Sequence, residues 1–184
     1  MNLANWITLL RILLIPFFIT AIVYYDPSQT YFKWIAFSFF VAACITDAID
    51  GLIARVRKEK TTLGSFLDPF ADKLLILAAF LCVNLSPNYT RTLPLWVLII
   101  IVSREFLLVS GLLILFFSQN KIIIEPNLLG KFTTVVQMIT AGALLGEFSW
   151  APYPAYLAAF LTILSGMTYI IREARRLNHG SPAH

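Results

Sequence analysis

Four aspartates in the stretch 47–72 are the side chains of this sequence best suited to chemistry. The stretch reads D-A-I-D-G-L-I-A-R, then eight residues, then G-S-F-L-D-P-F-A-D. Asp47 and Asp50 are three residues apart, so their carboxylates would share one face of a helix. Asp68 and Asp72, four residues apart, would share a face of the next helix. Carboxylates that face one another repel, so the pattern predicts divalent cations held between the two helices by hard oxygen ligands.

The elements that must position these carboxylates are membrane helices. Of the 184 residues, 59% are hydrophobic and only 13% are charged, which excludes an ordinary soluble globule. Near the centre of a bilayer each aspartate would cost about 3 kcal/mol, which bound metal must offset. We expect one domain over residues 1–177 and a disordered tail over 178–184.

Apolar runs of spanning length, separated by turns rich in proline and asparagine, predict an all-α integral membrane protein with six transmembrane helices. The predicted segments are Trp6–Tyr24, Lys33–Arg55, Asp68–Leu85, Leu93–Phe117, Lys131–Leu145 and Pro154–Ile171.

The distribution of lysine and arginine predicts the orientation. Two cations, Lys33 and Arg91, lie in the loops on one side of the predicted membrane. The loops and termini on the other side hold nine cations: Arg55, Arg57, Lys58, Lys60, Lys121, Lys131, Arg172, Arg175 and Arg176. Because cytoplasmic segments carry the excess of cations, we expect both termini and the aspartate stretch at the cytoplasmic side.

The full pattern is D-x-x-D-G-x-x-A-R, eight residues, then G-x-x-x-D-x-x-x-D. It resembles the signature of the CDP-alcohol phosphotransferases, membrane enzymes that transfer a phosphatidyl group from CDP-diacylglycerol to an alcohol. All eight fixed positions match, and the resemblance covers essentially the whole chain. It implies a cofactor of Mg²⁺ or Mn²⁺, two ions in all, a homodimer, and a place in a bacterial inner membrane with the active site facing the cytoplasm. The matching positions are Asp47, Asp50, Gly51, Ala54, Arg55, Gly64, Asp68 and Asp72.

The resemblance also implies the role of each position. Asp47, Asp50 and Asp68 would be metal ligands. Asp72 would complete the metal site and, as the catalytic base, take the proton from the acceptor hydroxyl. The remaining positions would form the CDP site, where a glycine admits the nucleotide and an arginine offers a fork of donors to phosphate. These CDP-binding residues are Gly51, Ala54, Arg55, Thr61 and Gly64.

Two other interpretations of the aspartates remain. In the first they are structural: Asp47 would pair with Arg55, and Asp68 would cap a helix that continues with Pro69. In the second they mark the ion path of a cation- or proton-coupled transporter. The nucleotide-sized space implied by Gly51 argues against transport, since a proton relay needs no such cleft.

The acceptor would be bound by the second half of the chain. Arg104 and Glu105 interrupt an apolar run, and Lys131 opens the next segment, so Arg104 and Lys131 are the candidate acceptor-binding residues. The alternatives are a packing ion pair for Arg104 with Glu105 and an interfacial anchor for Lys131.

The identity of the acceptor depends on two absent cations. Family members that use glycerol 3-phosphate read S-x-L-R and later K-x-K-T-x-x-Q. This chain has Leu113 at the arginine of the first motif and Thr133 at the second lysine of the other. A charge-assisted hydrogen bond contributes roughly 1.5–3 kcal/mol, so a phosphate dianion would bind poorly. The sequence therefore favours phosphatidylglycerol, as in cardiolipin synthases, with glycerol 3-phosphate as the alternative; inositol phosphate and serine are less favoured.

Overall fold

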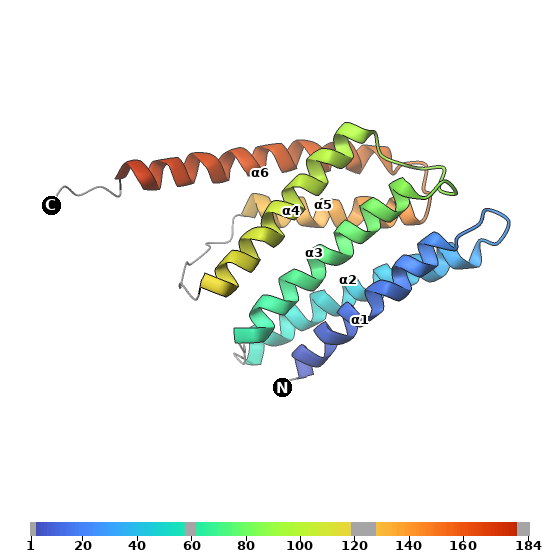
Figure 1. Cartoon of the computed structure of the whole chain (residues 1–184), viewed down its shortest axis with the longest axis horizontal. Coiled ribbons are helices and arrows are strands. Elements are labelled where there is room, and N and C mark those ends of the chain that lie inside the picture. The colour runs from blue at the N-terminus through green and yellow to red at the C-terminus, as the bar shows by residue number, and fades with distance from the viewer. Residues whose placement is uncertain (1–2, 58–61, 119–127, 180–184) are drawn as a thin grey trace.

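The computed structural model describes residues 3–57, 62–118 and 128–179, and side chains within 8–47, 67, 69–114 and 128–168. Over these ranges the chain forms six α-helices and no strand of a sheet (Figure 1). All six predicted segments are therefore confirmed as helices. Their bounds are α1 Leu3–Val23, α2 Tyr31–Arg57, α3 Thr62–Leu85, α4 Leu95–Ser118, α5 Leu128–Leu145 and α6 Pro152–His179.

The start of α3 differs most from the expected one. The helix begins at Thr62, so Gly64 and Asp68 lie inside it and neither forms a turn or a cap at its start. The expected capping role of Asp68 was therefore wrong. Pro69 also lies inside the helix, where its missing N–H removes one backbone hydrogen bond. Packing of the following apolar turns against α1 offsets that loss. At the other end of the chain, α6 continues to His179, two residues into the expected tail.

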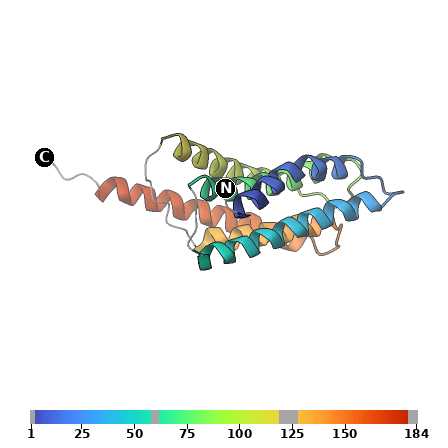
Figure 2. The same cartoon turned by 90° about the horizontal axis from the view of Figure 1, so that it is seen from below.

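Successive helices run in alternating directions along the long axis of the molecule. Both termini, at the start of α1 and the end of α6, lie toward the same end of that axis (Figure 1). Helix α1 packs against α2 and α3, α3 also contacts α4 and α5, and α5 packs along α6 (Figure 2). Fully buried Phe18, Ile22, Phe80 and Leu144 fill the space between them. Direct contact between α2 and α3 is limited, because α1 lies against both.

Two of the described helices pass a test of length and apolarity for crossing a membrane. They are Leu95–Ile114, with mean hydropathy 2.4, and Leu128–Leu145, with mean hydropathy 1.5. Helices α2 and α3 are long enough to span, but the aspartates and basic residues near their ends lower their apolarity. The all-helical architecture and its apolar surface agree with a membrane protein.

At the end opposite the termini, one carboxylate joins three loops. Glu147 accepts hydrogen bonds from Tyr25 Oη at 2.9 Å and Lys33 Nζ at 3.0 Å on one oxygen. Its other oxygen accepts from Thr90 N at 2.9 Å and Thr90 Oγ1 at 2.8 Å. Glu147 has a φ of 53°, in the left-handed region that a residue with a Cβ rarely adopts. The four hydrogen bonds offset this strain.

These hydrogen bonds control the ionisation of Glu147. Burial alone would raise the pKa of Glu147, but the donors of Thr90, Lys33 and Tyr25 outweigh it and lower the pKa to about 2. Because the folded pKa lies below the ordinary value of 4.5, the stabilisation is present above that value and is lost as the pH falls through 2.

We therefore expect Glu147→Gln to lower the free energy of unfolding by about 1.5–3 kcal/mol at neutral pH, since hydrogen bonds to a charged group are lost. The variant should also lose the part of the acid sensitivity that falls between pH 4.5 and 2. Thermal unfolding in detergent across pH 2–7 measures both effects. The control is Asp26→Asn, because the exposed carboxylate of Asp26 accepts its hydrogen bonds locally, from Ser28. Equal losses in the two variants would contradict the role assigned to Glu147.

Candidate functional site

Asp47 is held by an arginine from another helix. Arg11 of α1 donates from Nη1 to Asp47 Oδ1 at 3.0 Å, and from Nη2 to Thr46 Oγ1 at a weaker 3.5 Å. The Arg11 side chain is 4% exposed and that of Asp47 is 35% exposed. Buried arginine thus meets a carboxylate that solvent can still reach. The expected partner, Arg55, lies eight residues farther along α2, which puts its Cα about 12 Å away along the helix axis.

Arg11 was missed by the sequence interpretation. The signal was available, because Arg11 is the only charged residue in the apolar segment Trp6–Tyr24. A charge inside a membrane segment usually faces the protein interior and a partner of opposite sign. Only the packing of α1 against α2, however, identifies that partner as Asp47.

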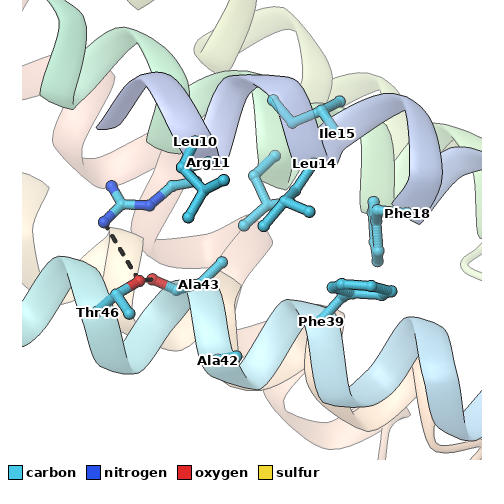
Figure 3. A pocket seen from close by; sticks show the side chains of 10 residues that line it. Leu10, Arg11, Leu14, Ile15, Phe18, Phe39, Ala42, Ala43 and Thr46 are labelled. Atoms are coloured by element: carbon cyan, nitrogen blue, oxygen red, sulfur yellow. Dashed lines mark hydrogen bonds between the residues drawn. The ribbon is translucent and has the colours of Figure 1, made fainter. Parts of the chain in front are cut away.

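An apolar groove with a cavity volume of about 90 Å³ runs between α1 and α2 from Arg11 and Thr46 (Figure 3). Arg11 and Thr46 lie at one end of the groove, and Phe18 and Phe39 lie toward the other. Leucine, isoleucine and alanine side chains line the rest. One polar end beside a carboxylate and a long apolar body suit an amphipathic molecule such as a lipid.

Asp72 lies on α3, half-buried, within electrostatic reach of Asp47, Lys73, Arg11 and Glu105. Among the described residues, its carboxylate takes no hydrogen bond and no ion pair. Its oxygens therefore have no partner among those residues, and the carboxylate of Asp47 is near. Carboxylate oxygens are the ligands that a divalent cation prefers. Asp47 and Asp72 therefore fit a metal site. Two carboxylates do not make a complete metal site. No group of three metal-ligating side chains occurs among the residues whose side chains are described.

The other predicted site residues lie where side chains are not described. Asp50, Gly51, Ala54 and Arg55 belong to α2, and Gly64 and Asp68 belong to α3. Thr61 lies outside the described residues altogether. The two aspartate pairs thus lie on consecutive helices, as predicted. The metal site formed by all four aspartates and the CDP site remain predictions.

The two candidate acceptor residues lie on α4 and α5. Arg104 donates from Nη1 to its neighbour Glu105 and to Gln137 Oε1 at 3.1 Å, and from Nη2 to Gly130 O at 3.2 Å. Its guanidinium is therefore fixed in place by the protein. Lys131 is exposed in the first turn of α5.

A lysine that the sequence interpretation did not use joins this group. Lys73 of α3 lies 3.1 Å from Glu105 Oε2 and donates to Thr134 Oγ1 at 3.2 Å. Glu105 itself is completely buried. A lysine directly after Asp72 could have been noted in the sequence as a second charge inside an apolar helix.

The two positions that lack the expected cations are filled differently. Thr133 is fully buried and donates its hydroxyl to Leu129 O at 2.7 Å, with Leu161 O of α6 at 3.5 Å. Leu113 is half-buried on α4. Position 133 therefore faces α6, so a lysine at this position would need a different local packing.

Comparisons with known proteins agree with these features. The CDP-alcohol phosphatidyltransferase family model matches residues 1–170. The chain is 35% identical to a Bacillus subtilis protein named CDP-diacylglycerol–glycerol-3-phosphate 3-phosphatidyltransferase, over 94% of this chain and 95% of that protein. A Mycobacterium tuberculosis protein named "Probable phosphatidylglycerophosphate synthase" is 33% identical over 95% of this chain and 82% of its own length. A Drosophila melanogaster protein named "Probable cardiolipin synthase (CMP-forming)" is 34% identical over 94% and 58% respectively.

These matches extend over nearly the whole chain and include the helices that carry Asp47 and Asp72. They decide between transporter and enzyme in favour of the enzyme. The protein belongs to the CDP-alcohol phosphatidyltransferase family.

Proposed function

We propose that the protein transfers the phosphatidyl group of CDP-diacylglycerol to glycerol 3-phosphate and releases CMP. The observation that carries this proposal is the likeness to the Bacillus subtilis relative, whose name states that reaction and which matches over nearly its full length. The Mycobacterium tuberculosis relative supports the same acceptor.

This proposal replaces the sequence-based preference for phosphatidylglycerol, which now rests on the Drosophila relative. That preference depended on the absence of cations at Leu113 and Thr133. When the cations available to the acceptor phosphate were compared, Lys73 was not included. Lys73 lies beside Glu105 in the same polar cluster as Arg104. A second cation for a phosphate monoester is therefore present near Arg104, supplied by α3.

The proposed reaction is one direct displacement. The acceptor hydroxyl oxygen attacks the lipid-linked phosphorus of the donor, the new P–O bond forms, and the P–O bond to CMP breaks. Asp72 accepts the hydroxyl proton, which suits a half-buried carboxylate without a partner among the described residues. Asp47, Asp50, Asp68 and Asp72 would hold the Mg²⁺ or Mn²⁺ ions. Bound divalent metal supplies neutralisation of the charge that develops on the phosphoryl oxygens.

The groove between α1 and α2 suits the lipid part of the donor. Its apolar lining would take an acyl chain, and Arg11 at its end would lie near the phosphates. For the whole chain we propose six membrane spans with both termini and the aspartate stretch on the cytoplasmic side of a bacterial inner membrane. The up-and-down course of the helices supports an even number of spans. A homodimer is proposed from the family resemblance.

The test is CMP release by purified protein with CDP-diacylglycerol and either Mg²⁺ or Mn²⁺. Glycerol 3-phosphate and phosphatidylglycerol are supplied in separate reactions, and the lipid products are identified by mass. We expect turnover with glycerol 3-phosphate and at least 10-fold less with phosphatidylglycerol. Turnover with phosphatidylglycerol alone would overturn the proposed acceptor, while the aspartate chemistry would stand.

A further inference from the structure

One buried cluster between α3, α4 and α5 holds two cations, Lys73 and Arg104, against the carboxylate of Glu105. Glu105 of α4 contacts Arg104 through Oε1 and lies 3.1 Å from Lys73 Nζ of α3 through Oε2. Oε1 accepts a hydrogen bond from Arg104, whereas Oε2 has Lys73 within ion-pair distance and takes no hydrogen bond among the described residues. These three groups carry a formal charge of +1, and Asp72, the residue before Lys73, is a further anion within electrostatic reach of the cluster.

Further hydrogen bonds fix both cations in direction. Lys73 donates to Thr134 of α5 at 3.2 Å. Arg104 donates to Gln137 at 3.1 Å, and Gln137 in turn donates to Thr162 of α6 at 3.4 Å. The cluster therefore connects α3, α4, α5 and α6, and its cations cannot turn away without breaking these contacts.

The charges of the cluster differ in their access to solvent. The Glu105 side chain is 0% exposed, whereas the side chains of Lys73 and Arg104 each keep 11%. A structural ion pair in a membrane protein would need only one cation, since unbalanced buried charge is costly. Because the proposed function commits the charge of Asp72 to the metal and to the acceptor proton, the cluster keeps one cation in excess, which an anionic ligand would balance.

The cluster also adjoins the predicted base. Lys73 directly follows Asp72 on α3, and Asp72 is within electrostatic reach of both Lys73 and Glu105. In glycerol 3-phosphate only a few bonds separate the hydroxyl from the phosphate, so an acceptor whose hydroxyl meets Asp72 would carry its phosphate close to the same turn of α3. The cluster is therefore placed to bind the acceptor phosphate.

We propose that Glu105 is the positioning residue of the acceptor site: its sealed carboxylate holds Lys73 and Arg104 toward the phosphate monoester of the acceptor. Lys73 thereby supplies a cation that the sequence lacks at positions 113 and 133. This inference rests on the proposed function, because the phosphate is that of glycerol 3-phosphate.

The experiment measures KM separately for glycerol 3-phosphate and for CDP-diacylglycerol in Glu105→Gln, Lys73→Gln and Lys73→Arg, in detergent with Mg²⁺. We expect Lys73→Gln and Glu105→Gln to raise the acceptor KM about 10-fold or more, because a charge-assisted contact is lost or misaligned. The donor KM should change less than 3-fold. Lys73→Arg keeps the charge and should recover most of the acceptor affinity.

A double variant tests whether Glu105 acts through the lysine. If it does, adding Glu105→Gln to Lys73→Gln should raise the acceptor KM by clearly less than the product of the two single effects. The matched control is Glu147→Gln, in which the same substitution removes another lysine-bound carboxylate at the opposite end. It should lower the melting temperature and leave both KM values unchanged.

The outcomes separate this inference from the proposed function. No turnover of glycerol 3-phosphate by the unchanged protein would overturn the proposed function. Turnover in which Lys73→Gln leaves the acceptor KM unchanged, or shifts both KM values equally, would overturn the positioning role alone. Should Glu105→Gln fail to fold, the two Lys73 variants still decide, since the proposal requires a selective loss in Lys73→Gln and recovery in Lys73→Arg.

Discussion

Asp72→Asn is expected to lower CMP release by a factor of 100 to 10,000 while the protein still folds and retains part of its donor binding. General-base catalysis contributes about this factor, and an asparagine amide cannot take the proton of the acceptor hydroxyl. Asp72 suits this role because it is half-buried and takes no hydrogen bond from the residues described around it. The substitution preserves shape, so the packing of α3 should change little.

The measurement is single-turnover CMP release, paired with binding of CDP-diacylglycerol at equilibrium. Asp26→Asn provides the matched control, because it makes the same change at an exposed aspartate far from α3. Its CMP release should equal that of the unchanged protein. If Asp72→Asn retained more than a tenth of the rate, Asp72 would not be the base, and the assignment of the reaction to this site would fail.

Asp47→Asn is expected to remove the metal dependence of donor binding and to weaken that binding by about 100-fold or more. Even the outer partners of metal ligands contribute 10- to 100-fold in affinity, so loss of a ligand should exceed this. The same change also leaves Arg11 without the carboxylate it contacts at 3.0 Å. A second variant must therefore separate the two effects.

Arg11→Gln supplies that separation, because it removes the cation and keeps the Asp47 carboxylate. A positive charge near a cation site opposes metal binding, so this variant should bind Mn²⁺ at least as tightly as the unchanged protein. Titration with Mn²⁺ followed by electron paramagnetic resonance measures both variants, with thermal unfolding as a check on folding. Equal loss of Mn²⁺ binding in the two would mean that Asp47 is a structural partner of Arg11 and not a ligand.

The helices were predictable because long apolar runs and turn residues fix them locally. All six predicted segments form helices, and most bounds differ by only a few residues. The beginning of α3 was not predictable in the same way. Gly64 and Pro69 usually mark helix ends, but here the packing of α3 against α1 and α4 keeps both inside the helix.

The aspartates could be found in the sequence because their spacing has a chemical meaning of its own. Their partners could not, since a partner is set by packing between helices far apart in the chain. Arg11 reaches Asp47 across 36 residues, and Lys73 meets Thr134 across 61. The argument from missing cations failed to include Lys73 for this reason, because it compared α4 and α5 alone and the additional charge comes from α3.

The carboxylate of Glu147 also sets an order of assembly during synthesis. Its partners Tyr25 and Lys33 are translated 122 and 114 residues earlier, and Thr90 57 residues earlier. Until the hairpin of α5 and α6 has inserted, the loops that carry Tyr25 and Thr90 lack the carboxylate that joins them. Closure of this end therefore waits for the last hairpin, and a nascent chain halted before residue 147 should present these loops to a protease that the finished protein resists.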